Sequence, residues 1–378
     1  MKTIHRTLTA LLAAALVVAP GLSAAKTLKI GSLSPLTGPY AADGNDIRHG
    51  VETAIALWEA KGGVPGYDKI EYYPQDSACD GKQAVSAANK LANLGVIGVV
   101  GAYCSSATIP ASDVLNEARV PVLTPASTNE KVTERGFKYM FRVCGRDDDQ
   151  AKVVAKFLSQ QLKVKSIALV DDKTTYTAGL AKNIKKFLKG TGIKVVAHEH
   201  VNQGDKDFSG VLTKIKATRP DVLYMSLYNP EGNLMAIQAR RLGLKAVLMT
   251  EDAVYHPNYL KIAKKAAEGT FLTYGQPPSE DIPEVAAFIN AYSAKYGQPG
   301  SYSAYAYDAA NVLLSAVAKV GADDPAKLAE AIRATRMQGA SKFIQFDGKG
   351  DSGSTYKVMV VRDGKFVPYW DPDTGKLY

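Results

Sequence analysis

The sequence lacks the short motifs that mark the common enzyme classes. It contains no Gly-x-Ser-x-Gly turn, no Walker phosphate-binding loop and no His-Glu-x-x-His zinc motif. His198 and His200 flank Glu199 on an expected strand, where both rings share one side, and a solvated strand face explains this spacing better than a metal site. Neither a metal ion nor an organic cofactor is therefore predicted, and the chain is not expected to be an enzyme.

Long hydrophobic segments are absent after the first residues. Lys2 and Arg6 precede an apolar segment at residues 8–19, and small residues follow at 23–25. This order is typical of a cleaved signal peptide, and the apolar segment is too short to span a bilayer. Because no cysteine lies near the expected cleavage site, a lipid anchor is not predicted. We expect residues 1–25 to be removed and the rest of the chain to be exported as a soluble protein.

A nucleic-acid-binding signature is missing as well, although the chain is basic. Its 46 lysine and arginine residues exceed its 37 aspartate and glutamate residues, which gives a net charge of +9. The lysines are spread along expected helices, as is typical of solvated helix faces, so nucleic acid is not an expected partner.

Three consecutive aspartates at residues 147–149 also have a structural explanation, because acids before a helix stabilise the positive end of its dipole.

Short apolar segments alternate with amphipathic segments along most of the chain. Expected strands lie at residues 27–33, 70–73, 96–100 and 120–124, and again at 166–171, 194–199, 221–227 and 246–249. This repeated β-α pattern predicts parallel sheets with helices on both faces. A chain of this length usually forms two domains, and we place the joint between the two units near residues 142–146.

The pattern changes after residue 275. Three helices are expected at residues 283–295, 305–320 and 325–333. A hairpin of strands at 343–346 and 357–362 is expected to follow, with its turn at 347–350. No low-complexity linker occurs anywhere, so several short crossings should join the two domains and form a hinge.

The most informative segment is the turn between the expected strand at residues 96–100 and the next helix. Cys104, Ser105 and Ser106 lie at this turn, where free N–H groups and serine hydroxyls can hold an anion. Ligands of open α/β sheets bind beyond the carboxyl ends of the strands, so a small carboxylate is expected here. In an oxidising compartment Cys79 and Cys104 could form a disulfide beside this site, which would leave Cys144 unpaired.

Several short segments point to one protein family. They are Leu36-Thr37-Gly38-Pro39, Asp76-Ser77-Ala78-Cys79-Asp80, Cys104-Ser105-Ser106, Thr124-Pro125-Ala126-Ser127-Thr128-Asn129 and Ala266-Ala267-Glu268-Gly269. With them, the chain after residue 25 resembles the periplasmic branched-chain amino-acid-binding proteins, which are type I substrate-binding components of ABC transporters.

The resemblance implies an α/β fold of two Rossmann-like lobes, joined by three crossovers and closing over a ligand between them. The N-terminal lobe would comprise residues 26–145 and 276–352, and the C-terminal lobe residues 146–275 and 353–378. It also implies a periplasmic monomer that captures a free amino acid or a similar small carboxylate. The protein would deliver this ligand to an ABC permease with its ATPase.

The resemblance also implies how the two charged groups of an amino acid are bound. The α-carboxylate is expected on Ser105, Ala126 and Thr128. Hydrogen bonds to a charged group contribute roughly 1.5–3 kcal/mol each, so these donors can replace water around the carboxylate. The α-ammonium is expected to pair with Asp252 or, failing that, with Glu251.

The chain departs from the family where the ligand side chain is held. Tyr176 and Tyr228 match aromatic positions of the second lobe. Asp43 stands where members for leucine, isoleucine and valine carry an aromatic residue. Asp43 is either exposed, with Tyr40 forming the wall, or in contact with a polar or basic group of the ligand. Tyr103 likewise replaces an aliphatic residue, so branched-chain specificity does not follow from the resemblance.

Two other functions stay open from the sequence. A receptor for an amide, urea or an aromatic acid would not need the acid that pairs with an ammonium. A secreted hydrolase would use Ser105 or Ser106 as nucleophile and would need His256 as its base. The absence of an enzyme motif makes the amino-acid-binding protein the prediction.

Overall fold

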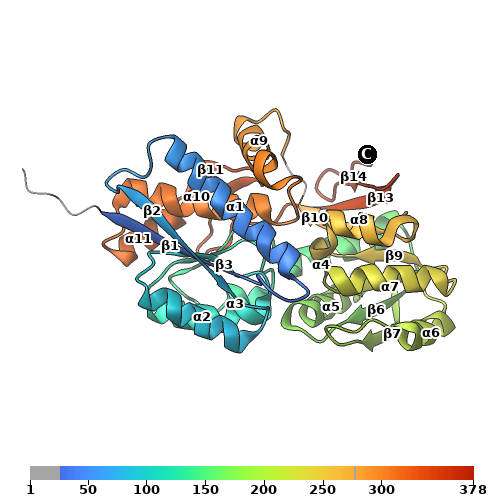
Figure 1. The fold of residues 1–378 in the computed structure, drawn as a ribbon. Coiled ribbons are helices and arrows are strands. Elements are labelled where there is room, and N and C mark those ends of the chain that lie inside the picture. Colours follow the sequence, from blue (N-terminus) through green and yellow to red (C-terminus); the bar gives the residue numbers. More distant parts are fainter. Residues whose placement is uncertain (1–25, 276–277) are drawn as a thin grey trace, which may run out of the picture.

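Two α/β lobes lie side by side in the computed structural model, which describes residues 26–275 and 278–378 (Figure 1). The predicted signal peptide, residues 1–25, lies outside the described residues. Each lobe has its own sheet, and a small third sheet pairs two short strands. The expected α/β architecture is therefore confirmed.

The N-terminal lobe is built on a five-stranded parallel sheet with the strand order β2-β1-β3-β4-β5. Its strands are β1 (Thr27–Ser34), β2 (Lys69–Asp76), β3 (Val99–Gly101), β4 (Val122–Thr124) and β5 (Met140–Arg142). β3 and β4 are fully buried, as expected for a parallel sheet covered on both faces. The sequence does not predict β5, because a strand of three residues shows almost no periodicity.

Helices cover both faces of this sheet (Figure 1). They are α1 (Ala41–Ala60), α2 (Gly81–Asn93), α3 (Ser105–Glu117), α9 (Pro283–Tyr296), α10 (Ser303–Val320) and α11 (Pro325–Arg333). α1 packs along α10, which also contacts β3 and β4, and α2 packs along α3. The chain after residue 278 therefore returns to complete the hydrophobic core of the first lobe.

The C-terminal lobe is built on a seven-stranded sheet with the order β14-β13-β10-β9-β8-β6-β7. Its strands are β6 (Ser166–Asp171), β7 (Lys194–His200), β8 (Val222–Ser226), β9 (Val247–Thr250), β10 (Phe271–Gly275), β13 (Tyr356–Arg362) and β14 (Lys365–Trp370). β6 to β10 are parallel, whereas β13 runs antiparallel to β10 and β14.

The α-helices of this lobe are α4 (Asp147–Lys156), α5 (Thr175–Leu188), α6 (Ser209–Thr218), α7 (Asn229–Arg241) and α8 (Pro257–Ala263). Short turns of other helix types are η1 (Glu130–Val132), η2 (Phe157–Gln161), η3 (Asp252–Val254) and η4 (Lys264–Ala266).

The predicted hairpin in the tail is wrong. β12 (Phe343–Gln345) pairs with β11 (Arg336–Gln338), while β13 joins the sheet of the other lobe. The turn after β12 instead leads the chain along the edge of the first sheet, where Asp351 forms a bridge with Arg142. The free edge of β10, which the sequence pattern does not reveal, provides the partner for β13.

Two glycines bring helix α1 close to its neighbours. A Cβ atom on Gly44 would lie 1.7 Å from the carbonyl oxygen of Pro35, and one on Gly50 would lie 2.3 Å from the carbonyl oxygen of Ser303. No residue with a side chain fits such distances. The first turn of α1 is therefore held against the loop after β1, and this contact turns Asp43 inward.

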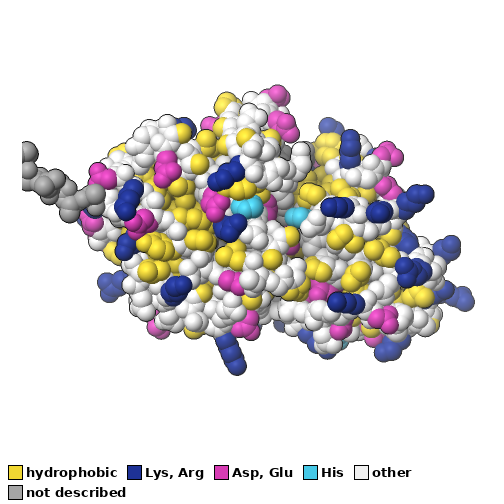
Figure 2. Space-filling model, in the orientation of Figure 1, with side chains coloured by type: hydrophobic (Ala, Val, Ile, Leu, Met, Phe, Trp, Pro, Cys, Tyr) yellow, Lys and Arg dark blue, Asp and Glu magenta, His cyan; other side chains and the backbone are white. Residues whose placement is uncertain are grey.

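Basic side chains are scattered over the surface. Figure 2 shows lysine and arginine side chains spread over this face of both lobes, without one dense patch. This distribution agrees with the sequence interpretation of solvated helix faces. Among the described residues, no helix combines the length and the hydropathy that crossing a membrane requires.

Candidate functional site

The predicted site residues are all buried, and they lie where the carboxyl ends of the two sheets face each other. They are Asp43, Tyr103, Ser105, Ala126, Thr128, Tyr176, Tyr228, Glu251 and Asp252. Contacts join the two lobes here: the Tyr103 and Tyr228 ring centroids are 5.6 Å apart, and Asn129 Nδ2 donates to the Thr175 carbonyl at 3.0 Å. The lobes are thus in a closed arrangement around this site.

Helix α3 brings its polar N-terminal end into the site. Its first residue is Ser105, and Cys104 is the N-cap. The N–H groups of Ala107 and Thr108 both donate to the Cys104 carbonyl at 2.9 Å. The N–H groups of Ser105 and Ser106 precede these first intrahelical bonds, so the helix start keeps donors for an anion.

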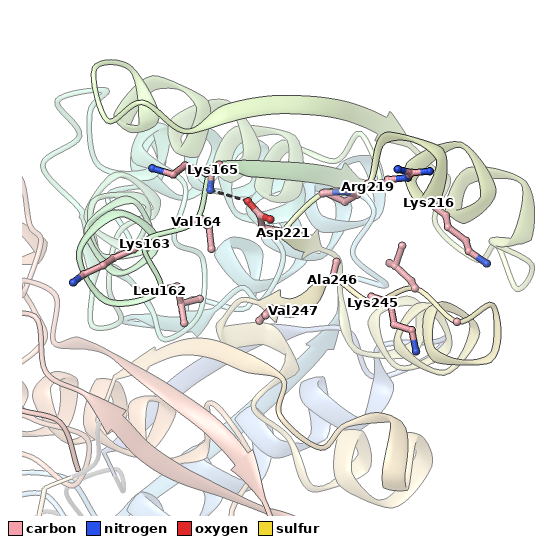
Figure 3. Close-up of a pocket in the computed structure, with 13 residues that line it drawn as sticks. Leu162, Lys163, Val164, Lys165, Lys216, Arg219, Asp221, Lys245, Ala246 and Val247 are labelled. Carbon is pink, nitrogen blue, oxygen red and sulfur yellow. Dashed lines mark hydrogen bonds between the residues drawn. The ribbon is translucent and has the colours of Figure 1, made fainter.

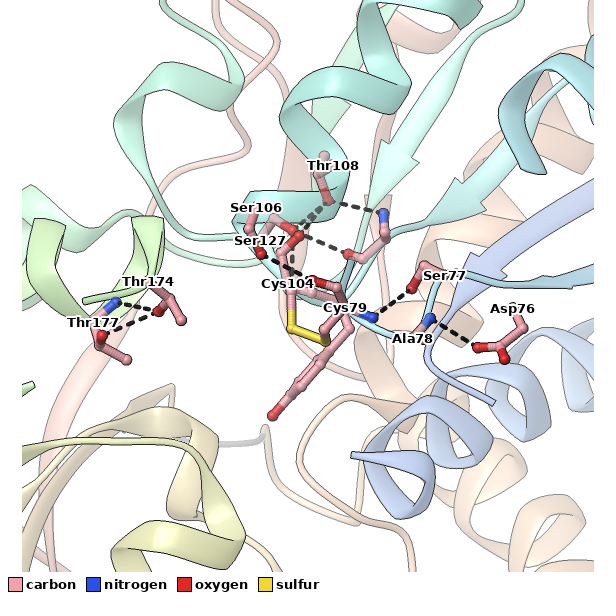
Figure 4. The surroundings of a disulfide bond; sticks show 12 residues. Asp76, Ser77, Ala78, Cys79, Cys104, Ser106, Thr108, Ser127, Thr174 and Thr177 are labelled. Atoms are coloured by element: carbon pink, nitrogen blue, oxygen red, sulfur yellow. Dashed lines mark hydrogen bonds between the residues drawn. A yellow bond between two sulfur atoms is a disulfide. The ribbon is translucent and has the colours of Figure 1, made fainter. Parts of the chain in front are cut away.

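The loop after β4 packs against the same corner (Figure 4). The Ser127 hydroxyl lies 2.5 Å from the Thr108 hydroxyl and 2.9 Å from the Tyr103 carbonyl oxygen. The Asn129 N–H points at the Ser105 hydroxyl at 3.4 Å. These contacts place Thr128 beside the start of α3.

Arg142 lies behind this loop and is fully buried. Its guanidinium donates to the carbonyls of Ser127 at 3.2 Å and Asn129 at 2.8 Å. It also forms an ion pair with Asp351, in which Nε and Oδ1 are 2.6 Å apart. Because two loop carbonyls point at one buried cation, Arg142 holds the loop in a single shape.

Two acids and a tyrosine form the opposite side of the site. The Tyr176 hydroxyl lies 2.6 Å from Glu251 Oε2 and 2.8 Å from Asp252 Oδ1. Asp252 also accepts a hydrogen bond from Gln150 Nε2 at 3.1 Å and one from the Tyr356 hydroxyl at 3.3 Å. Glu251 Oε1, in contrast, has no hydrogen-bond partner among the described residues.

Burial controls the charge of both acids. It raises the pKa of Asp252, and it raises the pKa of Glu251 well above the ordinary value, with the charge of Asp252 adding to the effect. Tyr176 can donate its one hydroxyl proton to only one of the two carboxylates at a time. A positively charged group beside this pair would allow both to ionise.

Asp147 is a third acid that the sequence interpretation missed. It is fully buried, and its two carboxylate oxygens have no hydrogen-bond partner among the described residues. Burial raises its pKa well above the ordinary value, interaction with the Thr128 side chain opposes this shift, and the charge of Asp252 adds to it. Asp148 and Asp149 instead pair with Arg146 and a lysine near the surface. The helix-dipole interpretation of the three aspartates therefore does not account for Asp147. The sequence feature that could have identified Asp147 is its position next to the predicted joint between the two units.

Tyrosine rings line the rest of the site. Tyr228 is their centre, with centroid distances of 5.0 Å to Tyr40, 5.6 Å to Tyr103 and 5.3 Å to Tyr176. Tyr302, which precedes α10, packs edge-on against Tyr103 at 5.4 Å. Rings from both lobes therefore meet at one aromatic cluster.

Asp43 faces into this cluster. Its side chain is only 2% exposed, so the alternative in which it is exposed to solvent is wrong. The close contact at Gly44 explains this position. Burial and the charge of Asp46 raise the pKa of Asp43 well above the ordinary value. Tyr40 is buried as well and contributes to the same wall.

The residues required by a hydrolase do not form a catalytic group. The Ser106 hydroxyl donates to the Cys79 carbonyl at 3.2 Å, and His256 Nδ1 accepts the N–H of Asn258 at 3.0 Å. Within residues 26–275 and 278–378, no hydrogen bond joins Ser105 or Ser106 to a histidine. His256 acts here as a helix N-cap.

The paired histidines on β7 bind an acid of the neighbouring strand. His198 Nε2 lies 2.6 Å from Asp171 Oδ2, and His200 Nδ1 lies 2.8 Å from Oδ1. Burial opposes ionisation, but these hydrogen bonds lower the pKa of Asp171 to about 2. Lys185 Nζ lies 2.8 Å from His198 Nδ1. The solvated-face interpretation is therefore wrong for His198, and the lysine ammonium disfavours a metal ion there.

A hollow of about 730 Å³ lies at the other end of the C-terminal sheet (Figure 3). It is lined by residues that precede β6, β8 and β9, including Lys165, Asp221 and Ala246. The Asp221 carboxylate accepts the N–H groups of Lys165 at 2.7 Å and Ser166 at 2.9 Å. Asp221 therefore joins the starts of two strands. The hollow lies at the edge of the sheet opposite the carboxyl ends, where α/β sheets bind their ligands.

Cys79 and Cys104 are joined by a disulfide, with their Cα atoms 5.3 Å apart, and Cys144 is free and buried. The bond fixes the start of α3 to the segment after β2 (Figure 4). We expect the double variant Cys79→Ser and Cys104→Ser to lose about 2–4 kcal/mol of unfolding free energy, because its unfolded chain is less restricted. Urea denaturation measures this loss. Cys144→Ser is the control, and an equal loss in both variants would contradict the expected contribution of the bond.

Two α/β lobes that close over a buried polar site define a two-lobed solute-binding protein. The chain belongs to the periplasmic binding protein family, whose family model matches residues 27–365. Membership in a family of binding proteins agrees with the prediction that the chain is not an enzyme. The resemblance stated from the sequence is confirmed.

Relatives and solved structures support this assignment along nearly the whole chain. The leucine-, isoleucine-, valine-, threonine-, and alanine-binding protein of Pseudomonas aeruginosa is 40% identical over 329 residues, which are 87% of this chain and 88% of that protein. A Leu/Ile/Val-binding protein of Rhizobium johnstonii is 38% identical, with 93% of each chain covered. The leucine binding protein LivK of Thermotoga maritima matches with a TM-score of 0.84 at 31% identity, covering 92% of this chain and 99% of LivK. The protein LivJ of Streptococcus pneumoniae, in complex with isoleucine, also matches at 0.84 with 28% identity, covering 90% of this chain and 98% of LivJ.

Proposed function

We propose that this protein captures a free amino acid in the periplasm and delivers it to an ABC permease with its ATPase. The single observation that carries this proposal is the pairing of anion donors at the start of α3 with buried acids across the interface. A zwitterion needs both halves of such a site, because burying either of its charges without a partner is prohibitively costly. Relatives named as amino-acid-binding proteins support the same function.

The export and the domain boundaries belong to this proposal. Residues 1–25 would be cleaved as a signal peptide, and the mature protein would act as a monomer. The N-terminal lobe would comprise residues 26–145 and 276–352, and the C-terminal lobe 146–275 and 353–378. The bridge between Arg142 and Asp351 supports a boundary near these positions, because two chain crossings lie side by side there.

The ligand carboxylate would be bound by Ser105, Ala126 and Thr128, next to the start of α3. The ammonium would lie against the acid cluster, which we define as Asp147, Glu251 and Asp252. Among the described residues, Glu251 Oε1 and both oxygens of Asp147 accept no hydrogen bond, whereas both Asp252 oxygens do. Tyr176 and Tyr228 would contact the ligand from the C-terminal lobe.

Calorimetric titration of the mature protein with the common amino acids tests the proposal. The tightest ligand is then compared with its N-acetyl derivative, which lacks the ammonium, and with its amide, which lacks the carboxylate. We expect both derivatives to bind at least about tenfold more weakly, because each leaves a buried group without its partner. If no amino acid binds in the micromolar range, the proposal fails. If the N-acetyl derivative binds as well as its parent, the protein is instead a receptor for acids that lack an ammonium.

Ligand binding is expected to release protons from the acid cluster. Burial raises the pKa of Asp147, Glu251 and Asp252 in the closed arrangement without ligand, and a bound ammonium favours their ionised forms. Affinity should therefore increase with pH and decrease as acid protonates the cluster. Titrations between about pH 5 and 8, in two buffers of different ionisation enthalpy, count the protons released. A binding enthalpy that is the same in both buffers would contradict this coupling.

A further inference from the structure

Asp43 is a buried acid of the inter-lobe site that binding of the ammonium and carboxylate does not use. It is 2% exposed, and its Oδ1 has no hydrogen-bond partner among the described residues. Asp46, one turn further along α1, is also buried but has three donors: the Tyr292 hydroxyl at 2.8 Å and the N–H groups of Gly300 and Tyr302 at 2.9 Å. Asp43 therefore differs from an ordinary structural acid of the same helix.

The surroundings of Asp43 are aromatic, and none of the described residues that shift its pKa carries a positive charge. Its pKa is raised by burial first and then by another acid, Asp46. The Tyr40 hydroxyl lies toward Glu231 and Gln203, whereas the Tyr103 hydroxyl also has no hydrogen-bond partner among the described residues. Both rings pack on Tyr228, at centroid distances of 5.0 Å and 5.6 Å. A buried carboxyl group and the Tyr103 hydroxyl therefore lie at the wall of the site, and both lack a hydrogen-bond partner among the described residues.

An aliphatic ligand side chain cannot satisfy these groups. Each buried polar atom that stays unpaired against a methyl group lowers affinity by roughly 5- to 150-fold. A nitrogen donor forms a hydrogen bond to Asp43, and the faces of Tyr40 and Tyr103 accommodate a cationic or amide group. The wall is therefore suited to a polar ligand side chain.

We propose that the protein selects an amino acid whose side chain ends in a nitrogen hydrogen-bond donor, and that this donor binds Asp43. An ammonium, a guanidinium and a carboxamide group share this chemistry. The inference rests on the proposed function, because the α-carboxylate and α-ammonium determine which end of the ligand reaches Asp43. Asp43 is then the residue that separates this protein from receptors for aliphatic amino acids.

Matched pairs of amino acids test the inference on the wild-type protein. Lysine is compared with norleucine, which lacks the terminal ammonium, and glutamine is compared with leucine; ornithine and arginine extend the cationic series. We expect at least one nitrogen ligand to bind about tenfold or more tightly than its aliphatic match. If leucine, isoleucine, valine or norleucine binds at least as tightly as every nitrogen ligand, the inference is overturned. If no amino acid binds at all, the proposed function fails instead.

Two substitutions of Asp43 identify the donor and its partner. Asp43→Asn keeps the shape of the side chain but loses the charge. The affinity for a cationic ligand should therefore fall about tenfold or more, whereas the affinity for an amide ligand should change only a few-fold. Asp43→Leu should weaken every nitrogen ligand by at least tenfold and should bind norleucine or leucine more tightly than the wild type does. This gain requires a folded site, so it separates lost recognition from lost structure. Glu117→Gln, at an exposed position of α3, is the control for a lost negative charge. Unchanged affinity of the nitrogen ligand in Asp43→Leu would overturn the inference.

Discussion

Arg142→Met is expected to lower the free energy of unfolding by about 3–5 kcal/mol. The substitution leaves the buried carboxylate of Asp351 without the guanidinium that lies 2.6 Å from it, and such a loss typically costs this amount. It also removes the donors that bind the carbonyls of Ser127 and Asn129. The variant should therefore bind its amino acid more weakly. Urea denaturation measures the stability, and calorimetric titration measures the affinity.

Arg146→Met is the matched control for this prediction. Arg146 binds the other oxygen of Asp351 at 2.8 Å, but its side chain is 15% exposed and makes further contacts near the surface. We expect Arg146→Met to lower the free energy of unfolding by about 1 kcal/mol, because water can replace a partly exposed ion pair. The double variant Arg142→Met with Asp351→Leu should recover part of the stability, since no buried charge then lacks a partner. Equal losses in Arg142→Met and Arg146→Met would refute the role of the buried pair.

Glu251→Gln is expected to weaken amino-acid binding by about 2–5 kcal/mol. Glutamine keeps the size of the side chain and can still accept a hydrogen bond from Tyr176, but it has no negative charge for the ammonium. Truncating one member of a buried, hydrogen-bonded charge pair typically costs this much. The free Oε1 atom of Glu251 is the observation that favours this residue for direct contact.

Asp252→Asn provides the comparison within the same cluster. Both of its carboxylate oxygens already accept hydrogen bonds, from Tyr176, Gln150 and Tyr356, so a smaller loss of affinity is expected. A large loss in Asp252→Asn together with an unchanged Glu251→Gln would reverse the assignment. Calorimetric titration of both variants with the same ligand decides between them. Circular dichroism spectra that match the wild type show that each variant is folded.

Much of the fold was predictable because the two lobes are made of local β-α units. Helices α9 and α10 and strands β1 and β6 lie within a few residues of their predicted positions, since their apolar residues repeat at regular spacing. The strands β5, β10, β11 and β14 were not predicted. β5 consists of three residues, and β14 becomes a strand only because the edge of β13 is available to it. Pairing with a distant partner leaves little trace in the local sequence.

The candidate site was predictable in part for the same reason. Ser105, Thr128 and Tyr228 follow strand ends, where ligands of parallel sheets bind, and the family resemblance gave each of them its expected role. Asp147 was missed because the local pattern of three aspartates before a helix already had a sufficient explanation. Only burial of one of the three, with no partner for its carboxylate, separates it from its neighbours.

The sequence by itself determined the class of this protein. The resemblance of its short segments to the periplasmic binding proteins carried that assignment, and the repeated β-α units and the segment Cys104-Ser105-Ser106 are local features that can be read without coordinates. The tertiary structure decided the directions of the side chains. It placed Asp43 inside the site because Gly44 allows α1 to approach Pro35. Within the part of the chain that the structure describes, it gave hydrogen-bond partners to both oxygens of Asp252 but none to Glu251 Oε1 or to Asp147. Burial and pairing depend on residues far apart in the chain, which come together only when the two lobes are folded and closed.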